Sequence, residues 1–332
     1  MSIWRKQGGV IGKPDGGNDY PSSGSWDVTE TYTDANLTPT GEVLFSTVQT
    51  NLSFTVPADV SSTVSIICVG GGGGGAASTS SSNGVSGGGG GGGGLHWINN
   101  ISVTVGETLT INIGAGGAGG TAAGQSNSVA GLPSNVGRGG TLLAQATGGD
   151  FGKFNTQSAA DAALGGVPST SLGGGGGNGG PGRGGRGGQG GSGGGGAGGY
   201  SGTGGRGGYY NIVPQIGAGG GGGGGGAVNG FTATVTSGGG GVNVYGAGAS
   251  GNQAPVNNQG NQTSTRGFQG SPVGTSTQTG VYGGGGTGAE DDSGAGGGTG
   301  SVGVVRIIWG EGRSFPSTNT DQASSNGNVT VI

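Results

Sequence analysis

The sequence predicts a mainly β and irregular protein, in which a small β-sandwich closes on a bundle of polyglycine II helices and an extended N-terminal segment serves as an anchor. Three observations predict this fold. The chain has 99 glycines among 332 residues, many of them in long runs. Strand-like alternation frames the glycine-rich region, and part of the glycine recurs with a step of three residues.

The longest uninterrupted glycine runs are residues 70–75, 87–94 and 219–226. Glycine contributes almost no apolar surface and loses more backbone entropy on folding than any other residue. Such runs can be ordered only where the backbone, rather than the side chains, builds the interior. Charged residues make up only 8% of the chain, so charge repulsion does not hold it open. We therefore expect a backbone-built core rather than a flexible linker.

The step of three matches a helix of the polyproline II type, which has three residues per turn. The repeat is mostly Gly-Gly-X with little proline, which does not fit the Gly-X-Y period of collagen. Two bare faces let neighbouring backbones approach and form hydrogen bonds between segments. The remaining side chain of each turn is predicted to point out of the bundle. The positions in question are Ala115, Ala118, Thr121, Arg183, Arg186, Gln189, Ser192, Ala197, Tyr200, Thr203, Arg206 and Tyr209.

Strands are predicted on both sides of the glycine-rich region. Within residues 43–69, one alternating run precedes Pro57 and a second covers Val64–Val69. Residues 98–113 alternate on both sides of Gly106-Glu107, which predicts a hairpin. Residues 302–309 form the last strand, with Val302, Val304 and Ile308 on one face and Val305, Ile307 and Trp309 on the other.

These elements divide the chain into three parts. Residues 1–41 form a polar anchor segment, residues 42–310 form the glycine-rich domain, and residues 311–332 form a polar tail. No signal-peptide core and no stretch long enough to cross a membrane is present in the sequence. Longer stretches that are poor in glycine, chiefly residues 142–172 and 242–282, are predicted to be loops at the ends of the bundle.

The residues of ordinary catalytic sites are scarce. The single histidine, His96, lies between a glycine run and a strand and is interpreted as packed or solvated. The single cysteine, Cys68, lies in an apolar run and is interpreted as a buried small hydrophobe. The acidic cluster at residues 290–292 could bind a hard cation but is typical of a solvated loop. We therefore predict that the protein is not an enzyme, binds no cofactor and has no metal site.

Arginines that recur between pairs of glycines in the three-residue repeat could indicate RNA binding, as in RGG segments. However, the net charge is −4 and the isoelectric point is about 4.8, which disfavours a phosphate backbone as partner. We predict no nucleic-acid partner.

Several stretches resemble glycine-rich bacteriophage virion proteins, of the kind seen in phages of cyanobacteria. The resemblance covers about residues 43–318 and a short N-terminal motif. The stretches that carry it are Phe54-Thr-Val-Pro-Ala-Asp-Val, Val64-Ser-Ile-Ile-Cys-Val with the following glycines, residues 93–117, Gly303-Val-Val-Arg-Ile-Ile-Trp-Gly-Glu-Gly-Arg-Ser-Phe-Pro, and Ser23-Gly-Ser-Trp-Asp-Val.

The resemblance implies a virion structural protein, similar to tail-fibre tip adhesins in which a polyglycine II sandwich presents loops for host attachment. The partner would be a host polysaccharide or outer-membrane protein, and a homotrimer is one expected assembly. Aromatic residues are the candidates for receptor contact, and large residues of the N-terminal segment are the candidates for the virion anchor. The receptor candidates are Phe151, Phe154, Tyr209, Tyr210, Phe268 and Tyr282, and the anchor candidates are Ile3, Trp4, Trp26 and Tyr32.

Two alternatives stay open. One is a capsid, neck or baseplate decoration or head-fibre protein that docks through its N-terminal segment. The other is an ice-binding protein, because flat polyglycine II faces can order water, although regular threonine or alanine rows are lacking.

Overall fold

The computed structural model describes residues 41–60, 62–78, 86–121, 128–153, 163–184, 192–208, 238–247, 282–289, 296–316 and the backbone of 328–331. By its internal contacts the chain divides into two compact units, Met1–Leu37 and Thr38–Ile332. All the described residues belong to the second unit.

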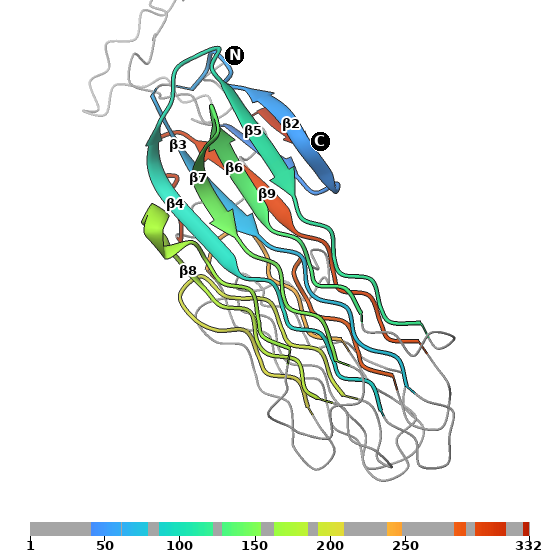
Figure 1. The fold of residues 1–332 in the computed structure, drawn as a ribbon. Coiled ribbons are helices and arrows are strands. Elements are labelled where there is room, and N and C mark those ends of the chain that lie inside the picture. The colour runs from blue at the N-terminus through green and yellow to red at the C-terminus, as the bar shows by residue number, and fades with distance from the viewer. Residues whose placement is uncertain are drawn as a thin grey trace, which may run out of the picture. The chain divides into compact units, whose positions relative to one another are not determined.

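The described residues are mainly β, with two sheets and a single short helical turn, η3 (Thr170–Leu172) (Figure 1). This part of the predicted fold class is confirmed. The six-stranded sheet has the order β10-β1-β9-β3-β4-β8 and is antiparallel except for the β10–β1 pair. Its strands are β1 (Gly41–Phe45), β3 (Thr63–Val69), β4 (Leu95–Ser102), β8 (Gly175–Gly177), β9 (Val304–Trp309) and β10 (Asn328–Val331).

The four-stranded antiparallel sheet has the order β2-β5-β6-β7. Its strands are β2 (Gln49–Thr55), β5 (Thr108–Ile113), β6 (Ser134–Arg138) and β7 (Thr141–Ala146). The two sheets pack face to face around one hydrophobic cluster, to which both contribute. Ile66 and Ile307 enter it from the six-stranded sheet, and Leu109, Ile111 and Val136 enter it from the other.

Strand β9 carries buried apolar residues on both faces, with Arg306 as its one charged residue, because both faces of its sheet are covered. Val305, Ile307 and Trp309 face the cluster between the sheets. Val304 and Ile308 face a second cluster on the outer side of the six-stranded sheet. The predicted faces are confirmed for these five residues, whereas Val302, which was predicted to share the face of Val304, lies before the strand begins. The antiparallel pairing of β9 with β1 joins strands from both sides of the glycine-rich region.

The hairpin predicted for residues 98–113 is wrong. Strand β4 bonds to β3 and β8, whereas β5 bonds to β2 and β6, so the connection crosses from one sheet to the other. The turn bonds instead to Val56, whose N–H donates to the carbonyl of Glu107 and whose carbonyl accepts from Gly106. Both strands turn an apolar face to the same interior, but they do so from opposite layers.

The loop predicted for residues 142–172 is also wrong in part, because β7 occupies its start and η3 its end. The predicted polar tail, residues 311–332, contributes β10, which pairs in parallel with β1. In the same segment Phe315 is buried in the second cluster.

The glycine segments continue from the strands and run side by side (Figure 1). Their amides donate to other segments, and residues 70–76 illustrate the pattern. Every third amide of residues 70–76 donates to the same neighbour, at 2.8–3.0 Å. The amides of Gly70, Gly73 and Ala76 donate to the carbonyls of Gly94, Gly91 and Gly88, respectively. Those of Gly71 and Gly74 donate to Leu132 and Val129, and those of Gly72 and Gly75 donate to Ser301 and Gly298.

The carbonyls of residues 70–76 accept from three further segments in the same step of three. The two sets of bonds together give this segment six neighbours, with no side chain between the backbones. A Cβ atom built on Gly73 would lie 1.9 Å from the carbonyl oxygen of Asp150. One built on Gly90 would lie 2.1 Å from that of Gly73. Only glycine fits such positions, because a neighbouring backbone occupies the space of a side chain.

The prediction that every third side chain points outward holds only in part. Ala118 and Thr121 are exposed, as predicted. Ser192, Ala197 and Tyr200 are buried, which contradicts it. The last two pack in the second cluster, where their segment covers the outer face of the six-stranded sheet. A side chain at one of these every-third positions is thus exposed only where no other segment of the chain packs over its own segment.

Candidate functional site

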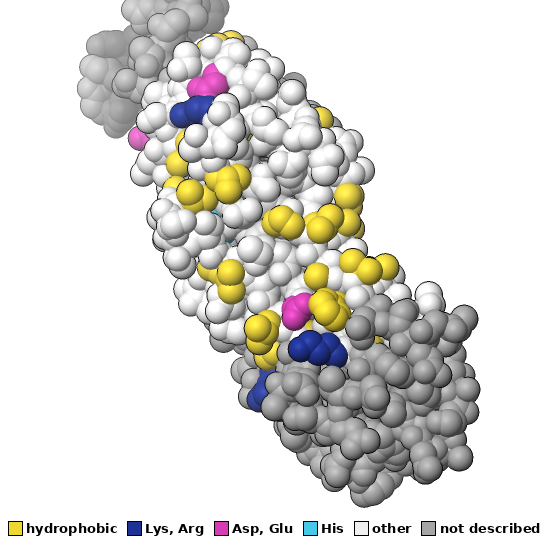
Figure 2. Space-filling model, viewed as in Figure 1, with side chains coloured by type: hydrophobic (Ala, Val, Ile, Leu, Met, Phe, Trp, Pro, Cys, Tyr) yellow, Lys and Arg dark blue, Asp and Glu magenta, His cyan; other side chains and the backbone are white. Residues whose placement is uncertain are grey.

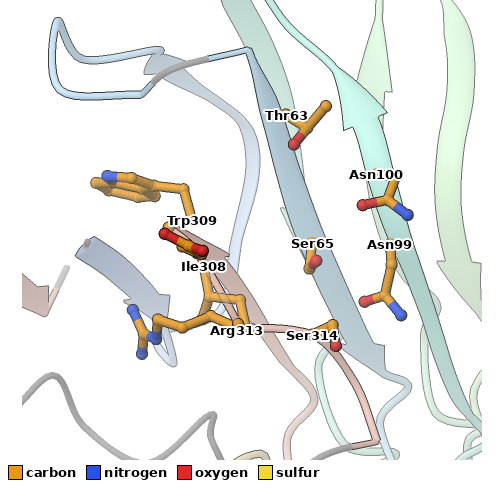
Figure 3. Close-up of a pocket in the computed structure, with 11 residues that line it drawn as sticks. Thr63, Ser65, Asn99, Asn100, Ile308, Trp309, Arg313 and Ser314 are labelled. Atoms are coloured by element: carbon orange, nitrogen blue, oxygen red, sulfur yellow. The ribbon is translucent and has the colours of Figure 1, made fainter. Parts of the chain in front are cut away.

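A polar pocket of about 480 Å³ lies on the outer face of the six-stranded sheet, under the chain that leaves β9 (Figure 3). Side chains from β3 and β4 lie on one side of it, and the turn after β9 lies on the other. The lining residues are Thr63, Ser65, Asn99, Asn100, Ile308, Trp309, Gly310, Glu311, Gly312, Arg313 and Ser314.

Asn99 fixes the wall of this pocket. Its Nδ2 donates to the carbonyl of Phe315 at 2.7 Å, and its Oδ1 accepts from the N–H of Phe315 at 2.9 Å. The ring of Phe315 in turn stacks on Tyr200, with ring centroids 6.3 Å apart. These contacts hold the chain after β9 against the sheet, so the pocket is preformed.

The charges next to the pocket are largely paired with one another. The buried carboxylate of Glu42 accepts hydrogen bonds from the guanidinium groups of Arg306 and Arg313. Arg306 also donates to the carbonyl of Val244 at 2.8 Å, and its guanidinium lies 4.4 Å from the ring centre of Tyr245. Burial lowers the pKa of Arg306, and the adjacent Glu42 opposes that shift.

The side chain of Arg313 extends away from Asn99 and Asn100 (Figure 3) and contacts Glu42 and the carbonyl of Gly41. The pocket therefore presents hydroxyl and amide groups, with the exposed carboxylate of Glu311 at its turn. Such groups can hydrogen-bond an uncharged polar ligand, such as the hydroxyls of a saccharide or the backbone of a peptide.

The histidine and the cysteine lie elsewhere and are structural. His96 is buried; its Nε2 donates to the carbonyl of Gly173 at 2.8 Å, and its Nδ1 accepts from the N–H of Gln145 at 3.3 Å. Burial lowers the pKa of this imidazole, which favours the neutral form. Cys68 is fully buried, which raises the pKa of its thiol. The interpretations of a packed histidine and a buried cysteine are confirmed.

Within the described ranges, no three His, Cys, Asp or Glu side chains are grouped so that they could hold a metal ion. In the same ranges, no helix has the length and apolar character that crossing a bilayer requires.

Two of the predicted site residues lie in the described ranges. Phe151 is half-buried and follows Asp150, whose carboxylate accepts its N–H at 2.9 Å. Tyr282 packs against the second cluster and pairs with Val242. Burial raises the pKa of its phenol. The structure does not bring these two residues together with the pocket. The remaining predictions lie outside the described residues: Phe154, Tyr209, Tyr210, Phe268, Ile3, Trp4, Trp26 and Tyr32.

Sequence reasoning missed the pocket residues. The Asn99-Asn100 pair interrupts the alternation of β4, and this is the signal that could have marked the site. Residues 310–314 span the predicted end of the domain and the start of the predicted polar tail, and nothing in the sequence places them against β3 and β4.

Among known proteins, no family model matches this chain, and no curated protein matches it significantly.

Proposed function

We propose that the glycine segments form a bundle of polyglycine II helices. The support is the step of three in the hydrogen bonds of residues 70–76, since a helix with three residues per turn presents each residue of a turn to a different neighbour. The close approach of the backbones at Gly73 and Gly90 supports the same geometry. A bundle tied together in several directions is a rigid scaffold.

Amide exchange across residues 173–208 tests the bundle. We expect slow exchange for Gly180, Gly195 and Gly198, whose amides are bonded to neighbouring segments. The exposed turn glycine Gly139 should exchange fast and serves as the internal control. Free-chain exchange rates at the bundle glycines would contradict the proposal and return this region to a flexible linker.

We further propose that the protein is a phage virion protein that acts as a tail-fibre receptor-binding adhesin. The observation that carries this proposal is the dense backbone bonding of the glycine segments, because loops on a rigid scaffold are where binding usually occurs. The virion-like sequence motifs support the same class of protein. The proposed contacts with a host polysaccharide or surface protein are Phe151, Phe154, Tyr209, Tyr210, Phe268 and Tyr282.

Adsorption of phage particles tests the adhesin proposal. Replacing residues 154–162 or 250–281 with short Gly-Ser linkers should abolish adsorption to the host. An equally disruptive change in the exposed β6–β7 turn at Gly139-Gly140 is the matched control and should leave adsorption intact. Immunoblots of purified particles confirm that each variant is incorporated. Normal adsorption by the loop variants would exclude the adhesin role.

A second candidate is a decoration, neck or baseplate protein that docks through residues 1–41, with Ile3, Trp4, Trp26 and Tyr32 as contacts. The division of the chain after Leu37 favours it, because it separates an N-terminal unit close to the predicted boundary. Imaging of intact particles separates the two candidates by the location of the protein. Deletion of residues 1–37 should remove it from the particle in either case.

A further inference from the structure

A β-bulge shapes the polar pocket on the outer face of the six-stranded sheet. The register of β3 and β4 shifts at Ser65, where Asn99 and Asn100 of β4 together lie opposite this one residue. Such bulges re-aim side chains and are common beside functional sites. Asn100 has a backbone φ of 58°, which asparagine adopts more readily than most residues with a side chain. Both asparagines consequently line the pocket.

The hydroxyl of Ser65 is the group that points to a ligand. Ser65 lines the pocket and is only 5% exposed. Within the described part of the chain, this hydroxyl has no hydrogen-bond partner. Figure 3 shows Ser65 between the asparagines of β4 and the turn after β9. Because a buried hydroxyl without a partner is unfavourable, a ligand that fills the pocket would satisfy it.

Other polar side chains around Ser65 are available in the same way. Those of Thr63, Asn100 and Ser314 line the pocket and have no hydrogen bond to another described residue. Asn99 differs, since both ends of its amide are bonded to the backbone of Phe315. The available groups are thus three hydroxyls and one amide, and each of them can both donate and accept.

The charges at the pocket disfavour an ionic ligand. The guanidinium of Arg313 is bonded to Glu42 and to the carbonyl of Gly41, and the exposed Glu311 would repel an anion. Glu311 is also the one carboxylate among the lining residues, which is too few for a hard cation. The ligand that fits is therefore uncharged.

A peptide fits the pocket less well than a saccharide. An extended peptide binds a sheet at a free edge, whereas β3 lies between β4 and β9 and is paired with both. The two large apolar residues of the lining, Ile308 and Trp309, are at most 4% exposed and offer no site for an apolar side chain. The hydroxyls of a sugar ring, by contrast, both donate and accept, as the available groups do.

We propose that this pocket binds a neutral saccharide unit through the side chains of Thr63, Ser65, Asn100 and Ser314. Its volume of about 480 Å³ lies within the range of small-molecule sites. Because no exposed aromatic ring lines it, the sugar is held by hydrogen bonds alone and binds weakly, with a dissociation constant on the order of 1 mM. The proposal uses only residues of the sandwich and the turn after β9, so it rests neither on the bundle nor on the adhesin role.

Nuclear magnetic resonance of the full chain, labelled with nitrogen-15, tests the proposal. D-glucose, D-galactose, D-mannose and N-acetyl-D-glucosamine are titrated separately to about 50 mM. At least one of them should shift the amide signals of Ser65, Asn100 and Gly312. Sodium phosphate and a (Gly-Ser)₃ peptide, titrated in the same way, should leave these signals in place.

The double variant Ser65→Ala/Asn100→Gly removes two of the proposed contacts. Glycine adopts the backbone conformation of Asn100 without strain, so the bulge is retained. The dissociation constant of the sugar should rise at least about tenfold. The matched control Ser53→Ala/Asn51→Gly makes the same changes on β2, where both residues are exposed and Asn51 has a φ of 56°. It should bind the sugar as the wild type does.

Thermal unfolding gives a second readout. Ser65→Ala alone should not lower the melting temperature, because the hydroxyl that it removes has no partner in the described part of the protein. A lower melting temperature would show that the fold already uses this hydroxyl and would overturn the proposal. So would the absence of shifts with all four sugars, shifts that persist in the Ser65/Asn100 variant, or tighter binding of phosphate or of the peptide than of any sugar. Phage adsorption and amide exchange test the adhesin role and the bundle separately.

Discussion

The sandwich and the glycine segments have interiors of opposite kinds. Between the sheets, buried side chains such as Ile66, Ile111 and Ile307 fill the space. Between the glycine segments the neighbouring backbones themselves fill it, and carbonyl oxygens lie where a Cβ atom would be. The first interior is stabilised mainly by burial of apolar surface, and the second by hydrogen bonds between segments.

This difference determines what each interior tolerates. A side-chain core can shift rotamers and relax around a small change in volume. A backbone interior has no rotamers to shift, and a displaced segment strains the bonds to all its neighbours. One carbon atom should therefore cost little in the sandwich and much among the glycine segments. Of the four predictions below, Gly73→Ala and Ile307→Val test this contrast, and the other two concern charged groups of the sandwich.

The largest effect is expected for Gly73→Ala. The added methyl group meets the carbonyl oxygen of Asp150, so the segment must move and lose bonds to its neighbours. We expect a loss of at least about 4 kcal/mol, above the usual ~1–3 kcal/mol for an overpacked core. Thermal unfolding followed by circular dichroism measures it. Ala118→Ser, which adds one atom at an exposed position of a neighbouring segment, is the control. Equal stability of the two variants would refute a backbone-built interior.

Next in size is Glu42→Gln, which breaks the buried ion cluster on the outer face of the six-stranded sheet. Arg306 and Arg313 would keep their buried charges without a carboxylate between them. We expect a cost of about 3–4 kcal/mol in urea unfolding. Glu107→Gln breaks the partly exposed pair with Arg138 and should cost no more than about 1 kcal/mol. Similar costs for the two variants would show that the buried cluster is not held by its charges.

A smaller effect is expected for Ile307→Val, which removes one carbon from the side-chain interior. Ile307 is fully buried between the sheets. The loss should be about 1 kcal/mol, which is typical for this substitution in a core. Its comparison with Gly73→Ala under the same unfolding conditions puts a one-carbon change in each interior on one scale. A cost as large as that of Gly73→Ala would remove the contrast.

The smallest effect is a dependence of stability on pH at His96, which joins the sandwich to Gly173 near the glycine segments. Burial lowers its pKa below the ordinary value of 6.5, while the unfolded chain takes up a proton at that value. The unfolded state thus binds more protons below pH 6.5, so stability is full above that pH and falls as the pH is lowered. Unfolding midpoints between about pH 5 and pH 8 measure this slope. His96→Gln should reduce it; an unchanged slope would assign it to other groups.

The sequence predicted the strands best where large apolar residues are dense. The second run of residues 43–69 and the last strand correspond to β3 and β9, with the faces of β9 assigned correctly. It failed for β6 and β7, where Ser134–Arg138 and Thr141–Ala146 carry few large apolar residues. Alternation of apolar and polar residues indicates that one face of a strand is buried. A short strand beside the glycine segments can be stabilised instead by its backbone hydrogen bonds to neighbouring strands.

The candidate site was not predicted, since it depends on contacts between distant residues. Asn99 and Phe315, which fix the pocket, are 216 positions apart, and Glu42 and Arg306 are 264 positions apart. Arg306 lies in a strand pattern of apolar residues, and no local signal shows that a carboxylate from β1 will neutralise it. The receptor contacts proposed for six aromatic residues all remain predictions, and the structure describes the positions of two of these residues, Phe151 and Tyr282.

The sequence by itself determined where a side-chain interior and where a backbone interior could form, because both depend on the local order of apolar residues and glycine. Only the tertiary structure decided which sheet each strand joins and which side chains of the three-residue glycine repeat are exposed. Ala118 and Ala197 occupy equivalent positions in the step of three, yet one is exposed and the other buried. The reason is physical: a three-residue period fixes the direction of a side chain around its own segment, but the segment packed next to it comes from elsewhere in the chain.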